Sequence, residues 1–592
     1  MGLIVQKYGG TSVATVERIQ AVAQRILATV EQGQSVVVVV SAMGQTTDTL
    51  LELARAVSPN PPARELDMLL STGEQVSIAL VALALTALGQ PAISLTGTQI
   101  GIITEAEHGR ARILHIPTDR IHQELEQGKV VVVAGFQGIS SSRTLEITTL
   151  GRGGSDTSAV ALAAALGADR CEIYTDVPGI LTTDPRVVPA AQVLPQVTCE
   201  EMLELASLGA KVLHPRAVEI ARNFGVPVVV RSSWTDEPGT RLLTPERRTI
   251  PQRDLEVSRW VDGVELDDRQ AKVALCNVPD RPGMAAQLFG ALAAAEINVD
   301  LIIQSIQAGE TNDIAFTVQQ SDLAKTERLV RDLMPHWGEA VTCTVSAAMA
   351  KVSIVGAGMV GRPGVAAAMF SALGEVGINI DLISTSEIKV SCLVALAQAT
   401  QAVQVLSSRF KVPVLPPPTA TGGLMPVRGA ALDSQQARLA IQQVPDRPGS
   451  AACLFLALAQ ARVSVDMIIQ SERVTWVQGQ PTRDIAFTVH QDDVELARTA
   501  LETALAKLAC DTLTIDREIA KVSVVGSGMV RQPGVAARMF ASLGQAGINI
   551  QMIATSEIKI SCLVPRNLGK QALQVIHQGF GLDQPLGEEP DH

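Results

Sequence analysis

Short runs of β-branched residues alternate with helical patterns in the first part of the chain, up to about residue 245. Their continuous Val and Ile content is typical of strands covered on both faces. The expected strands lie at 3–9, 35–42, 92–97, 129–136, 171–176 and 227–233. Apolar residues at helical spacing predict helices at 15–31, 63–88, 118–127 and 155–167. The alternation predicts an α/β domain with a mostly parallel sheet and helices on both faces, in which ligands bind at the carboxyl ends of strands.

The rest of the chain contains internal repeats. The segment VPDRPG occurs at 278–283 and again at 444–449, and residues 351–394 recur with few changes at 521–564. A pair of modules has therefore been copied, with a linker rich in Pro and Gly between the copies. The predicted borders are 1–247 for the α/β domain, followed by modules 1 to 4 at 264–345, 346–425, 430–515 and 516–592.

Each module follows the order strand, Pro-Gly turn, amphipathic helix, strand, strand, helix, strand. In module 1 the first strand is expected near 271–278 and the first helix near 283–295, with Met284, Leu288 and Leu292 at helical spacing. Two helices on one face of a small antiparallel sheet form a ferredoxin-like α+β module. The exposed sheet edges of such modules favour side-by-side pairing, which creates pockets at the interfaces.

Composition excludes some classes of function. The 592 residues, 47% hydrophobic and 18% charged, are typical of a globular protein with several domains. A formal net charge of -12 argues against a nucleic-acid-binding surface. The eight cysteines form no C-x-x-C pair, which favours reduced thiols. Because the N-terminus lacks a signal-peptide pattern and the apolar stretch 77–89 is shorter than a membrane span, we expect a cytoplasmic protein without membrane contact.

Glycine-rich segments with charged residues follow several expected strands. KYGGTS at 7–12 places Lys7 beside two glycines, where a compact cation can hold phosphates without the Walker pattern, although a solvated lysine before a helix has the same pattern. TTLGRGGSDTSA at 148–159 places Arg152 and Asp156 on a turn into a helix, whose first N–H groups favour an anion. Glu74 lies early in an apolar helix, where it serves either the helix dipole or a substrate ammonium group.

Together these segments resemble the aspartate kinase family, within the amino-acid kinase superfamily. The resemblance covers the first domain nearly end to end and is carried by KYGGTSV, SAMG, STGEQ, GFQG, TTLGRGGSDTSA, YTDVPGI-TTDPR and LGAKVLHPRA. The repeated modules resemble ACT modules, the amino-acid-sensing domains at the C-terminus of aspartate kinases. Most aspartate kinases carry two such modules, so four is a departure from the family pattern.

The resemblance implies an amino-acid-kinase fold and transfer of the γ-phosphoryl group of ATP, with Mg²⁺, to the β-carboxylate of L-aspartate. The product is then 4-phospho-L-aspartate, in the first step toward lysine, threonine and methionine. Feedback inhibition by lysine, threonine or both through the ACT modules, and a homodimer, are further expectations. The nucleophile is already a carboxylate, so we expect alignment and charge neutralisation, rather than a general base, to carry catalysis.

The family motifs imply roles for residues of the first domain. By resemblance, Lys7 lies beside the transferring phosphates and Asp156 organises the catalytic site. Glu74 binds the substrate ammonium group and Arg152 its α-carboxylate, since a planar guanidinium suits a carboxylate. Further substrate contacts are expected from Thr47 and Ser155. The residues expected to hold the nucleotide are Lys7, Tyr8, Gly9, Gly10, Ser41, Thr175, Asp176, Asp184, Arg186, Lys211 and Val212.

The turn DRPG before a helix, followed by INVD or INID, is the ligand-binding pattern of ACT modules, although N-x-D is also a common turn. The effector residues expected in modules 1 and 2 are Asp280, Asn298, Val299, Asp300, Gln304, Asn379, Ile380 and Asp381. Those expected in modules 3 and 4 are Asp446, Asp466, Gln470 and Asn549. Ser464 and Gln551 replace an asparagine and an aspartate in the second copy, so we expect sites that differ. No metal-ligating cluster is predicted.

Three other functions share parts of this sequence. A sibling kinase for acetylglutamate, carbamate or uridylate has the same fold, but Glu74, Arg152 and the ACT modules argue against it. Lys7 and Asp156 argue against a non-catalytic amino-acid sensor. A bifunctional kinase–homoserine dehydrogenase needs a dinucleotide-binding domain. VGAGMVG at 355–361 mimics the motif of such a domain but lies inside a repeated module.

Overall fold

A computed structural model describes residues 2–208, 212–246, 255–256, 260–306, 311–359, 362–416, 425–510, 512–529 and 532–584. Contacts divide the chain into two compact units. Unit 1 contains residues 1–181, 193–206 and 210–258, and unit 2 contains 182–192, 207–209 and 259–592. The segment 182–192 therefore belongs to unit 2, although the chain returns to unit 1 after it.

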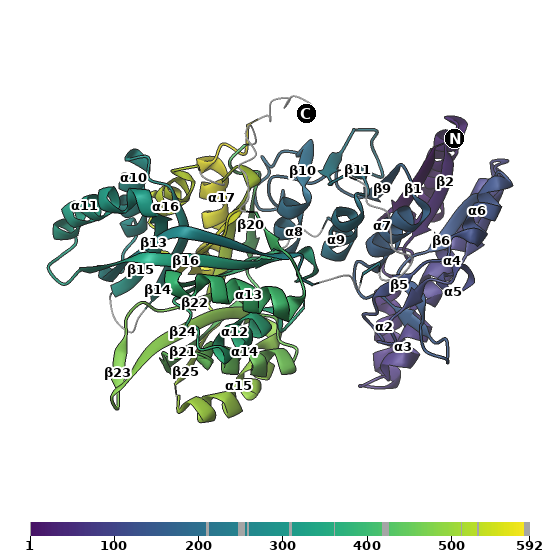
Figure 1. Cartoon of the computed structure of the whole chain (residues 1–592). Coiled ribbons are helices and arrows are strands. Elements are labelled where there is room, and N and C mark those ends of the chain that lie inside the picture. The colour runs from purple at the N-terminus through teal and green to yellow at the C-terminus, as the bar shows by residue number, and fades with distance from the viewer. Residues whose placement is uncertain are drawn as a thin grey trace. The chain divides into compact units, whose positions relative to one another are not determined.

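Unit 1 is built on an eight-stranded sheet, in which all neighbours run parallel except β11 and β12 (Figure 1). The predicted strands and the predicted parallel sheet are confirmed. The strands, in spatial order, are β10 (Gln196–Thr198), β12 (Thr240–Leu243), β11 (Val228–Ser232), β9 (Arg170–Thr175), β1 (Leu3–Tyr8), β2 (Ser35–Val40), β6 (Val130–Ala134) and β3 (Ala92–Leu95).

Helices cover both faces of this sheet. Helices α1 and α4 pack against Val36, Val38 and Val40 on one face, and α7 packs beside β1 and α9 on the other. Alternate residues of β2 face opposite ways, so both sets of valines are buried. The helices of this unit are α1 (Val16–Glu31), α2 (Thr46–Val57), α3 (Ala63–Leu70), α4 (Thr72–Ala87), α5 (Gly97–Ile100), α6 (Asp119–Glu126), α7 (Gly154–Leu166), α8 (Cys199–Ser207) and α9 (Pro215–Phe224).

A second, four-stranded sheet in unit 1 was not predicted. Its strands are only two to four residues long, so they carry no readable alternation of apolar and polar residues. In spatial order they are β5 (Ile113–His115), β4 (Ile103–Thr104), β7 (Gln137–Ser140) and β8 (Ile147–Thr149). This sheet positions the segment that leads into α7.

Helices α3 and α4 follow each other directly and form a run of 25 residues, Ala63–Ala87. By length and composition this run is able to cross a membrane, although the stretch 77–89 alone is shorter than a span. The apolar residues of α4 belong to the core of unit 1. Ile78, Val81 and Leu85 are buried against α1 and the eight-stranded sheet, as expected of a core helix.

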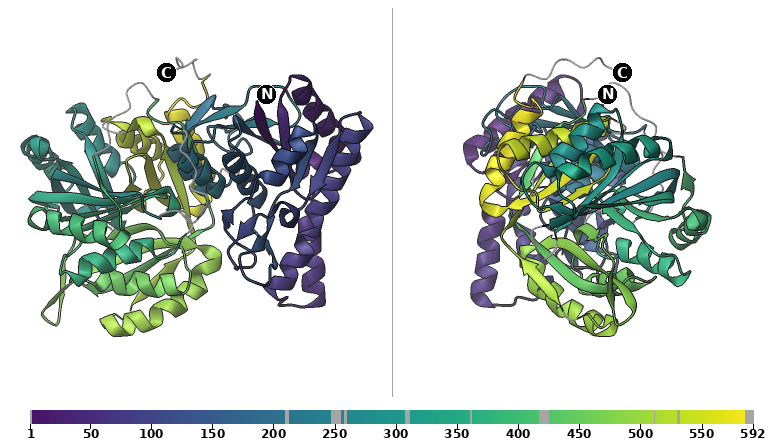
Figure 2. Two further views of the ribbon diagram at one scale, coloured as in Figure 1. Left: turned by 45° about the vertical axis from the view of Figure 1, so that its right-hand side comes forward. Right: turned by 90° about the vertical axis from the view of Figure 1, so that its left-hand side faces the viewer.

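Unit 2 contains four α+β modules with antiparallel sheets, as predicted (Figure 2). The elements of the first copy are β13 (Gly263–Pro279), α10 (Met284–Ala294), β14 (Val299–Ile306), β15 (Thr311–Gln319), α11 (Leu323–Leu333), β16 (Thr342–Val355), α12 (Val365–Glu375), β17 (Leu382–Thr385), β18 (Lys389–Ala395), α13 (Ala399–Phe410) and β19 (Val414–Leu415). Those of the second copy are β20 (Gly429–Asp433), β21 (Gln436–Pro445), α14 (Ser450–Gln460), β22 (Asp466–Gln470), β23 (Thr475–Val477), β24 (Gln480–His490), α15 (Val494–Leu508), β25 (Leu513–Asp516), β26 (Ile519–Val525), α16 (Val535–Gln545), β27 (Met552–Thr555), β28 (Lys559–Pro565) and α17 (Gly569–Gly579).

The modules of each copy are interleaved. Residues 263–267 of β13 precede module 1 but pair with 351–355 of β16 in the sheet of module 2. In the second copy, β20 likewise pairs with β26 of module 4, although β21 of module 3 follows β20 directly. A strand from before the first module of each pair therefore completes the sheet of the second. The module borders themselves stay predictions.

The modules pair across the two copies. Strand β14 of module 1 pairs antiparallel with β27 of module 4. Helix α10 lies beside α16 (Figure 1), and the Phe289 and Phe540 rings are edge to face at 5.3 Å. Modules 2 and 3 pair through α12 and α14, with Phe370 and Phe455 at 5.5 Å. The side-by-side pairing of modules that the sequence predicts thus occurs within one chain.

Candidate active site and effector sites

The carboxyl ends of four parallel strands meet at one edge of the eight-stranded sheet. Tyr8 at the end of β1 is in register with Val40 of β2 and Tyr174 of β9, and Val40 is in register with Ala134 of β6. The residues that follow these ends at the same edge are Gly9, Ser41, Thr175 and Gly135. Parallel sheets bind ligands at this edge.

Lys7 and Asp156 form a buried ion pair at this edge. Lys7 Nζ lies 2.6 Å from Asp156 Oδ1, and both side chains are about nine-tenths buried. Lys7 is held by β1, and Asp156 by the first turn of α7. The pair fixes the Lys7 ammonium group beside the N-terminus of α7, where free N–H groups favour an anion.

Two glycines allow the backbone to come close at this edge. A Cβ atom at Gly10 would lie 2.7 Å from the Ala42 carbonyl oxygen, and the Gly44 N–H donates to the Gly10 carbonyl at 3.0 Å. Gly153, the residue before α7, has φ +72°, and a Cβ atom there would overlap the His214 ring at 2.3 Å. Only glycine fits both positions without a shift of the neighbours.

Glu74 is a buried carboxylate with one unsatisfied oxygen. The side chain is 2% exposed in the first turn of α4, and its Oε1 accepts from the Ala42 N–H at 3.1 Å. Oε2 has no hydrogen-bond partner in the described structure. Burial raises the pKa of Glu74 to about 7. A cationic group from outside the chain would both satisfy Oε2 and stabilise the charged form.

Arg152 lies beside the start of α2. Its guanidinium is 92% exposed and is 3.2 Å from Asp48, the residue after Thr47. Thr47 is half-buried in the first turn of α2, and Ser155 is buried in the first turn of α7 against Gly135. The exposed guanidinium is therefore able to exchange its contact with Asp48 for a carboxylate of a bound molecule.

The other residues expected to hold a nucleotide lie mostly on the same edge. The Tyr8 side chain does not, because it is fully buried and stacks on Tyr174 with ring centroids 4.8 Å apart. Its carbonyl accepts from the Ser41 N–H at 3.1 Å, so only the main chain of Tyr8 faces the edge. Thr175 donates to the exposed Asp176 at 3.2 Å. Val212 is half-buried ahead of α9, and Lys211 lies outside the described residues.

Asp184 and Arg186 lie on the segment 182–192, which belongs to unit 2. The Arg186 guanidinium donates to both Asp184 oxygens, at 2.7 to 3.2 Å, and these hydrogen bonds lower the pKa of Asp184. Arg186 is 86% exposed. Sequence reasoning placed both residues in the α/β domain, since nothing in the local pattern shows which core a loop packs on.

Two residues that position the glycine loop were missed. The His214 ring packs on Gly153, and its Nδ1 accepts from the Arg216 N–H at 3.3 Å. Arg216 donates to the Leu150 and Ala111 carbonyls at 2.5 and 2.8 Å and pairs with Glu256 at 2.7 Å. The available signal was the segment HPR before α9, in which Pro marks a helix start and leaves His and Arg beside it.

Modules 1 and 4 bring Asp280 and Asn549 together at a small pocket. Asp280 Oδ1 accepts from Asn549 Nδ2 at 2.7 Å and from Asn312 Nδ2 at 2.8 Å. Gln304 donates to the Ile550 carbonyl across the same interface at 2.7 Å. The turn of one module thus faces the helix-to-strand segment of the other.

Modules 2 and 3 repeat this arrangement. Asn379 Nδ2 donates to Asp446 Oδ1 at 2.9 Å, and Gln470 and Ile380 line the same pocket. Arg483 replaces Asn312 there and pairs with Asp446 at 2.9 Å and Asp381 at 3.1 Å. The two sites therefore share their geometry, but the Arg483–Asp381 ion pair of modules 2 and 3 corresponds to the uncharged Asn312 and Gln551 of modules 1 and 4.

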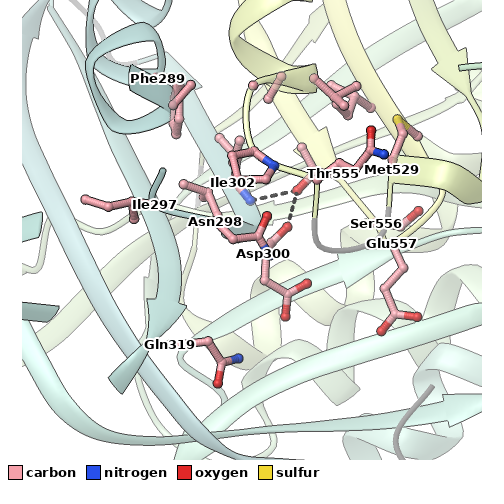
Figure 3. A pocket seen from close by; sticks show the side chains of 18 of the residues that line it. Phe289, Ile297, Asn298, Asp300, Ile302, Gln319, Met529, Thr555, Ser556 and Glu557 are labelled. Carbon is pink, nitrogen blue, oxygen red and sulfur yellow. Dashed lines mark hydrogen bonds between the residues drawn. The ribbon is translucent and has the colours of Figure 1, made fainter. Parts of the chain in front are cut away.

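A larger pocket lies on the other side of the module 1 and 4 interface (Figure 3). Asn298, Val299 and Asp300 of module 1 line it, and the Ile302 N–H donates to Thr555 of module 4 at 2.7 Å. Its carboxylates outnumber its ammonium groups. They are Glu265, Asp267, Asp300 and Glu557, against Lys351 in the lining and Lys389, which pairs with Glu265 and with Glu557.

The corresponding pocket of modules 2 and 3 has no excess of carboxylates. Asp466 and Glu387 line it together with Arg362, and Lys521 binds Asp466 at 2.5 Å. Burial favours neutral Asp466, but the Lys521 and Lys559 ammonium groups outweigh it and hold its pKa well below the usual range. All the residues predicted to bind effectors thus lie at two module interfaces, and the two interfaces differ as the substitutions at Ser464 and Gln551 suggest.

We searched the described part of the chain for side chains that could bind a metal ion without other ligands. No group of three or more His, Cys, Asp or Glu side chains there is placed to hold a metal ion.

Comparisons with known proteins give a consistent result. The amino acid kinase family model matches residues 2–232, and the ACT domain model matches 276–332, 352–410, 442–505 and 522–580. The aspartokinase of Corynebacterium efficiens is 49% identical over 414 residues, which are 70% of this chain and 97% of that protein. An aspartokinase from a Bacillus strain is 51% identical over 416 residues, covering 70% of this chain and 98% of its own.

The solved aspartate kinase of Synechocystis is similar over the whole chain. It is 56% identical, with a TM-score of 0.86, and the match covers 100% of this chain and 99% of that one. The resemblance in the motifs, the fold and these comparisons agree. The chain belongs to the aspartokinase family of phosphotransferases.

Proposed function

We propose that the chain transfers the γ-phosphoryl group of ATP to the β-carboxylate of L-aspartate. The observation that carries this proposal is the unsatisfied Oε2 of buried Glu74, which suits the ammonium group of an α-amino acid. Arg152 supplies the opposite charge for the α-carboxylate. With both ends held, the side-chain carboxylate is left free to react, and relatives named aspartokinase support the identity of the amino acid.

The transfer needs no general base. An oxygen of the β-carboxylate attacks the γ-phosphorus, the bond to the bridging oxygen breaks, and ADP leaves with that electron pair. Thr47 and Ser155 orient the substrate, and Lys7, held by Asp156, neutralises charge on the phosphoryl oxygens. Glu74 and Arg152 contribute mainly by alignment.

The residues at the sheet edge fit a nucleotide. Gly10 and the N-terminus of α7 offer backbone N–H groups to phosphates, whereas the Gly9 N–H donates to the Tyr174 carbonyl at 3.3 Å. Gly9, Thr175, Asp176, Asp184, Arg186 and Val212 are proposed to hold the rest of ATP. Mg²⁺ is usually bound by phosphates, water and one or two carboxylates, so we propose that it enters with ATP and that Asp156 faces it. When bound, it supplies further neutralisation of phosphate charge.

A direct assay tests this function. Purified chain is incubated with ATP, Mg²⁺ and L-aspartate, and formation of ADP and of aspartate hydroxamate is followed. Acetylglutamate, carbamate and uridylate serve as alternative acceptors in parallel. Turnover with one of these and none with aspartate would replace the proposal by a sibling kinase. No turnover with any acceptor would favour an amino-acid sensor.

Replacing Arg152 with alanine is expected to raise the KM for aspartate by about 10- to 100-fold, which corresponds to the loss of charge-assisted hydrogen bonds worth about 1.5–3 kcal/mol. The KM for ATP should change little. Steady-state kinetics with each substrate varied in turn measure both values. Arg152→Lys is the control, since it keeps the charge but loses the planar fork and should be intermediate. Unchanged aspartate saturation would remove Arg152 from the substrate site.

We further propose that the module interfaces bind end-product amino acids and so inhibit the kinase. The excess of carboxylates in the large pocket of modules 1 and 4 favours the side-chain ammonium of lysine. The pocket of modules 2 and 3 has no such excess of carboxylates, which favours a neutral side chain such as that of threonine. Inhibition then requires each effector to bind the less active state more tightly.

Asp267→Asn tests the assignment of lysine. Burial favours neutral Asp267, but hydrogen bonds from Gln270 and the Arg269 N–H lower its pKa, so the substitution removes a negative charge from the lining. The lysine concentration for half-inhibition is expected to rise roughly five-fold, as for about 1 kcal/mol of lost attraction. Inhibition by threonine should not change. Inhibition curves in the wild type and the variant measure both.

Asp433→Asn is the matched control for this prediction. Asp433 accepts from Gln436 and from the Gln435 N–H, as Asp267 does from Gln270 and Arg269, but it lies in the second copy and outside the large pocket. An equal loss of lysine inhibition in both variants would point to a general effect on the modules, and so against the assignment.

The reaction is proposed as the first step toward lysine, threonine and methionine, carried out in the cytoplasm by a homodimer. Reduced cysteines support the compartment: all eight are free, and burial raises the pKa of the Cys171, Cys199, Cys392 and Cys562 thiols, which makes them poor nucleophiles.

A further inference from the structure

The two copies in unit 2 differ in what covers one sheet edge. In the first copy, β19 runs parallel to the start of β13, and the Val264 N–H donates to the Pro413 carbonyl at 3.0 Å. The repeated sequences align Val264 with Ala430. In the second copy the Ala430 N–H donates at 2.8 Å to the carbonyl of Thr182, a residue from the amino acid kinase part of the chain. The segment 182–192 thus takes the place that β19 fills in module 2.

The segment is held there by several buried contacts. Thr182 is fully buried, and its Oγ1 lies 2.9 Å from His577 Nε2 on α17. The same hydroxyl accepts from the Gln192 N–H at 3.0 Å, which closes the segment on itself. Gln574 on α17 donates to the Val187 carbonyl at 3.1 Å. Val188 belongs to the apolar core that includes Leu573 and Ile576 of α17.

His577 is specific to the copy that holds this segment. The repeat places Ser407 at the corresponding position of α13, where its hydroxyl donates to the Val412 carbonyl of its own module. Burial lowers the pKa of His577, so the imidazole is neutral and acts as a hydrogen-bond partner rather than as a charge. The duplicated helix has therefore changed at the position whose side chain hydrogen-bonds to Thr182.

We propose that Thr182 and His577 are positioning residues for the nucleotide, because they hold the segment that presents Asp184 and Arg186. The inference rests on the proposed role of these two residues in ATP binding. Asp184 and Arg186 lie between the anchored ends, Thr182 and Val188, and are paired with each other, with Arg186 exposed and Asp184 half-buried. Module 4 then influences the affinity for ATP, because it holds the segment 182–192 in one conformation.

Loss of the contact between Thr182 and His577 should raise the KM for ATP and leave the KM for aspartate unchanged. A segment that is ordered in advance binds its ligand without a further loss of conformational entropy, so a loosened segment binds ATP more weakly. The groups proposed to bind aspartate lie on other segments, at Glu74, Thr47 and Arg152. A general loss of folding would instead lower kcat and affect both KM values.

The test uses Thr182→Val and His577→Ser in the full chain; the second gives module 4 the residue of module 2. Each is expected to raise the KM for ATP at least five-fold, with kcat and the KM for aspartate within two-fold of wild type. His577→Gln keeps a polar group in reach of Thr182 and should recover most of the ATP affinity. Ser407→Ala is the control in the first copy and should leave the KM for ATP unchanged.

Hydrogen exchange provides a readout that does not depend on activity. The amides of 182–192 should exchange faster in His577→Ser than in wild type, and those of α13 should not. Normal exchange in this variant, or faster exchange with an unchanged KM for ATP, would overturn the inference. Arg186→Ala separates this result from the proposed function. If it too leaves the KM for ATP unchanged, the nucleotide role of the segment fails; if it raises that KM, only the positioning role fails.

Discussion

Replacing Lys7 with alanine is expected to lower kcat by about 100- to 1000-fold. Lys7 is fixed by its ion pair with Asp156 at the end of β1, so its charge is in place before the reaction begins. A preorganised donor at developing phosphoryl charge is typically worth about 2.7–4 kcal/mol of transition-state stabilisation. Because the charge acts most strongly on the transition state, the KM for ATP should rise much less than kcat falls.

Steady-state kinetics at saturating aspartate measure this effect, and two variants serve as controls. Lys7→Arg keeps a positive charge on a larger side chain and should recover part of kcat. Asp156→Asn leaves Lys7 without its partner and should lower kcat while the lysine remains. Wild-type turnover in Lys7→Ala would remove Lys7 from the mechanism. Circular dichroism of each variant shows whether the buried pair is also needed for folding.

Replacing Glu74 with glutamine is expected to raise the KM for aspartate at least 100-fold. Removing one partner of a buried charge pair costs about 2–5 kcal/mol, much of it from the ammonium group left without its counter-charge. Glutamine is of the same size and keeps an oxygen for the Ala42 N–H, so the fold should not change. Titration of the variant with aspartate, followed by ADP release, measures the loss, and normal saturation would contradict the assignment.

The pKa of Glu74 gives this prediction a second readout. The substrate ammonium binds the carboxylate, and burial raises the pKa of Glu74 from its usual value near 4.5 to about 7 in the free protein. The kcat/KM for aspartate should therefore fall as pH drops below about 7 in the wild type. In Glu74→Gln this limb of the profile should be absent. A wild-type limb near pH 4.5 would show that another group, not a buried Glu74, controls binding.

The same substitution should stabilise the protein above pH 7. An acid whose pKa is higher in the folded state takes up protons on folding, so stability falls as pH rises from about 4.5 to about 7. Above that range the charged Glu74 costs about 3 kcal/mol, from a shift of about 2.5 pKa units. We expect a higher Tm for Glu74→Gln than for wild type at pH 8 and a smaller difference at pH 5, measured without substrates.

Local pattern predicted most of the fold. The long Val runs at 36–40 and 130–134 predicted buried parallel strands, because few other elements bury five consecutive β-branched or small residues. The interleaving of modules was not predictable from the same signal. The alternation of residues 263–267 shows that they form a half-buried strand, but not that their partner lies at 351–355, almost ninety residues away.

That candidate site residues come together was predictable where a motif carries them. Lys7 and Asp156 lie in different segments, and the structure brings them to 2.6 Å. The contact of Arg216 with Leu150 and Glu256 was missed. A single arginine in the sequence gives no indication of which distant groups its side chain contacts. The packing of 182–192 on module 4 was missed for the same reason, since a polar loop with Pro and Gly carries no sign of its distant partner.

The pairing of module 1 with module 4, and of module 2 with module 3, has a consequence for how sensing depends on protein level. An interface between separate chains dissociates at low protein concentration, and the ligand sites at that interface are then lost. Here the paired modules belong to one polypeptide, so their effective concentration does not depend on the concentration of the protein. Duplication of the module pair has thus made these pockets independent of dilution, so that a cell holding few copies of the chain still keeps them assembled.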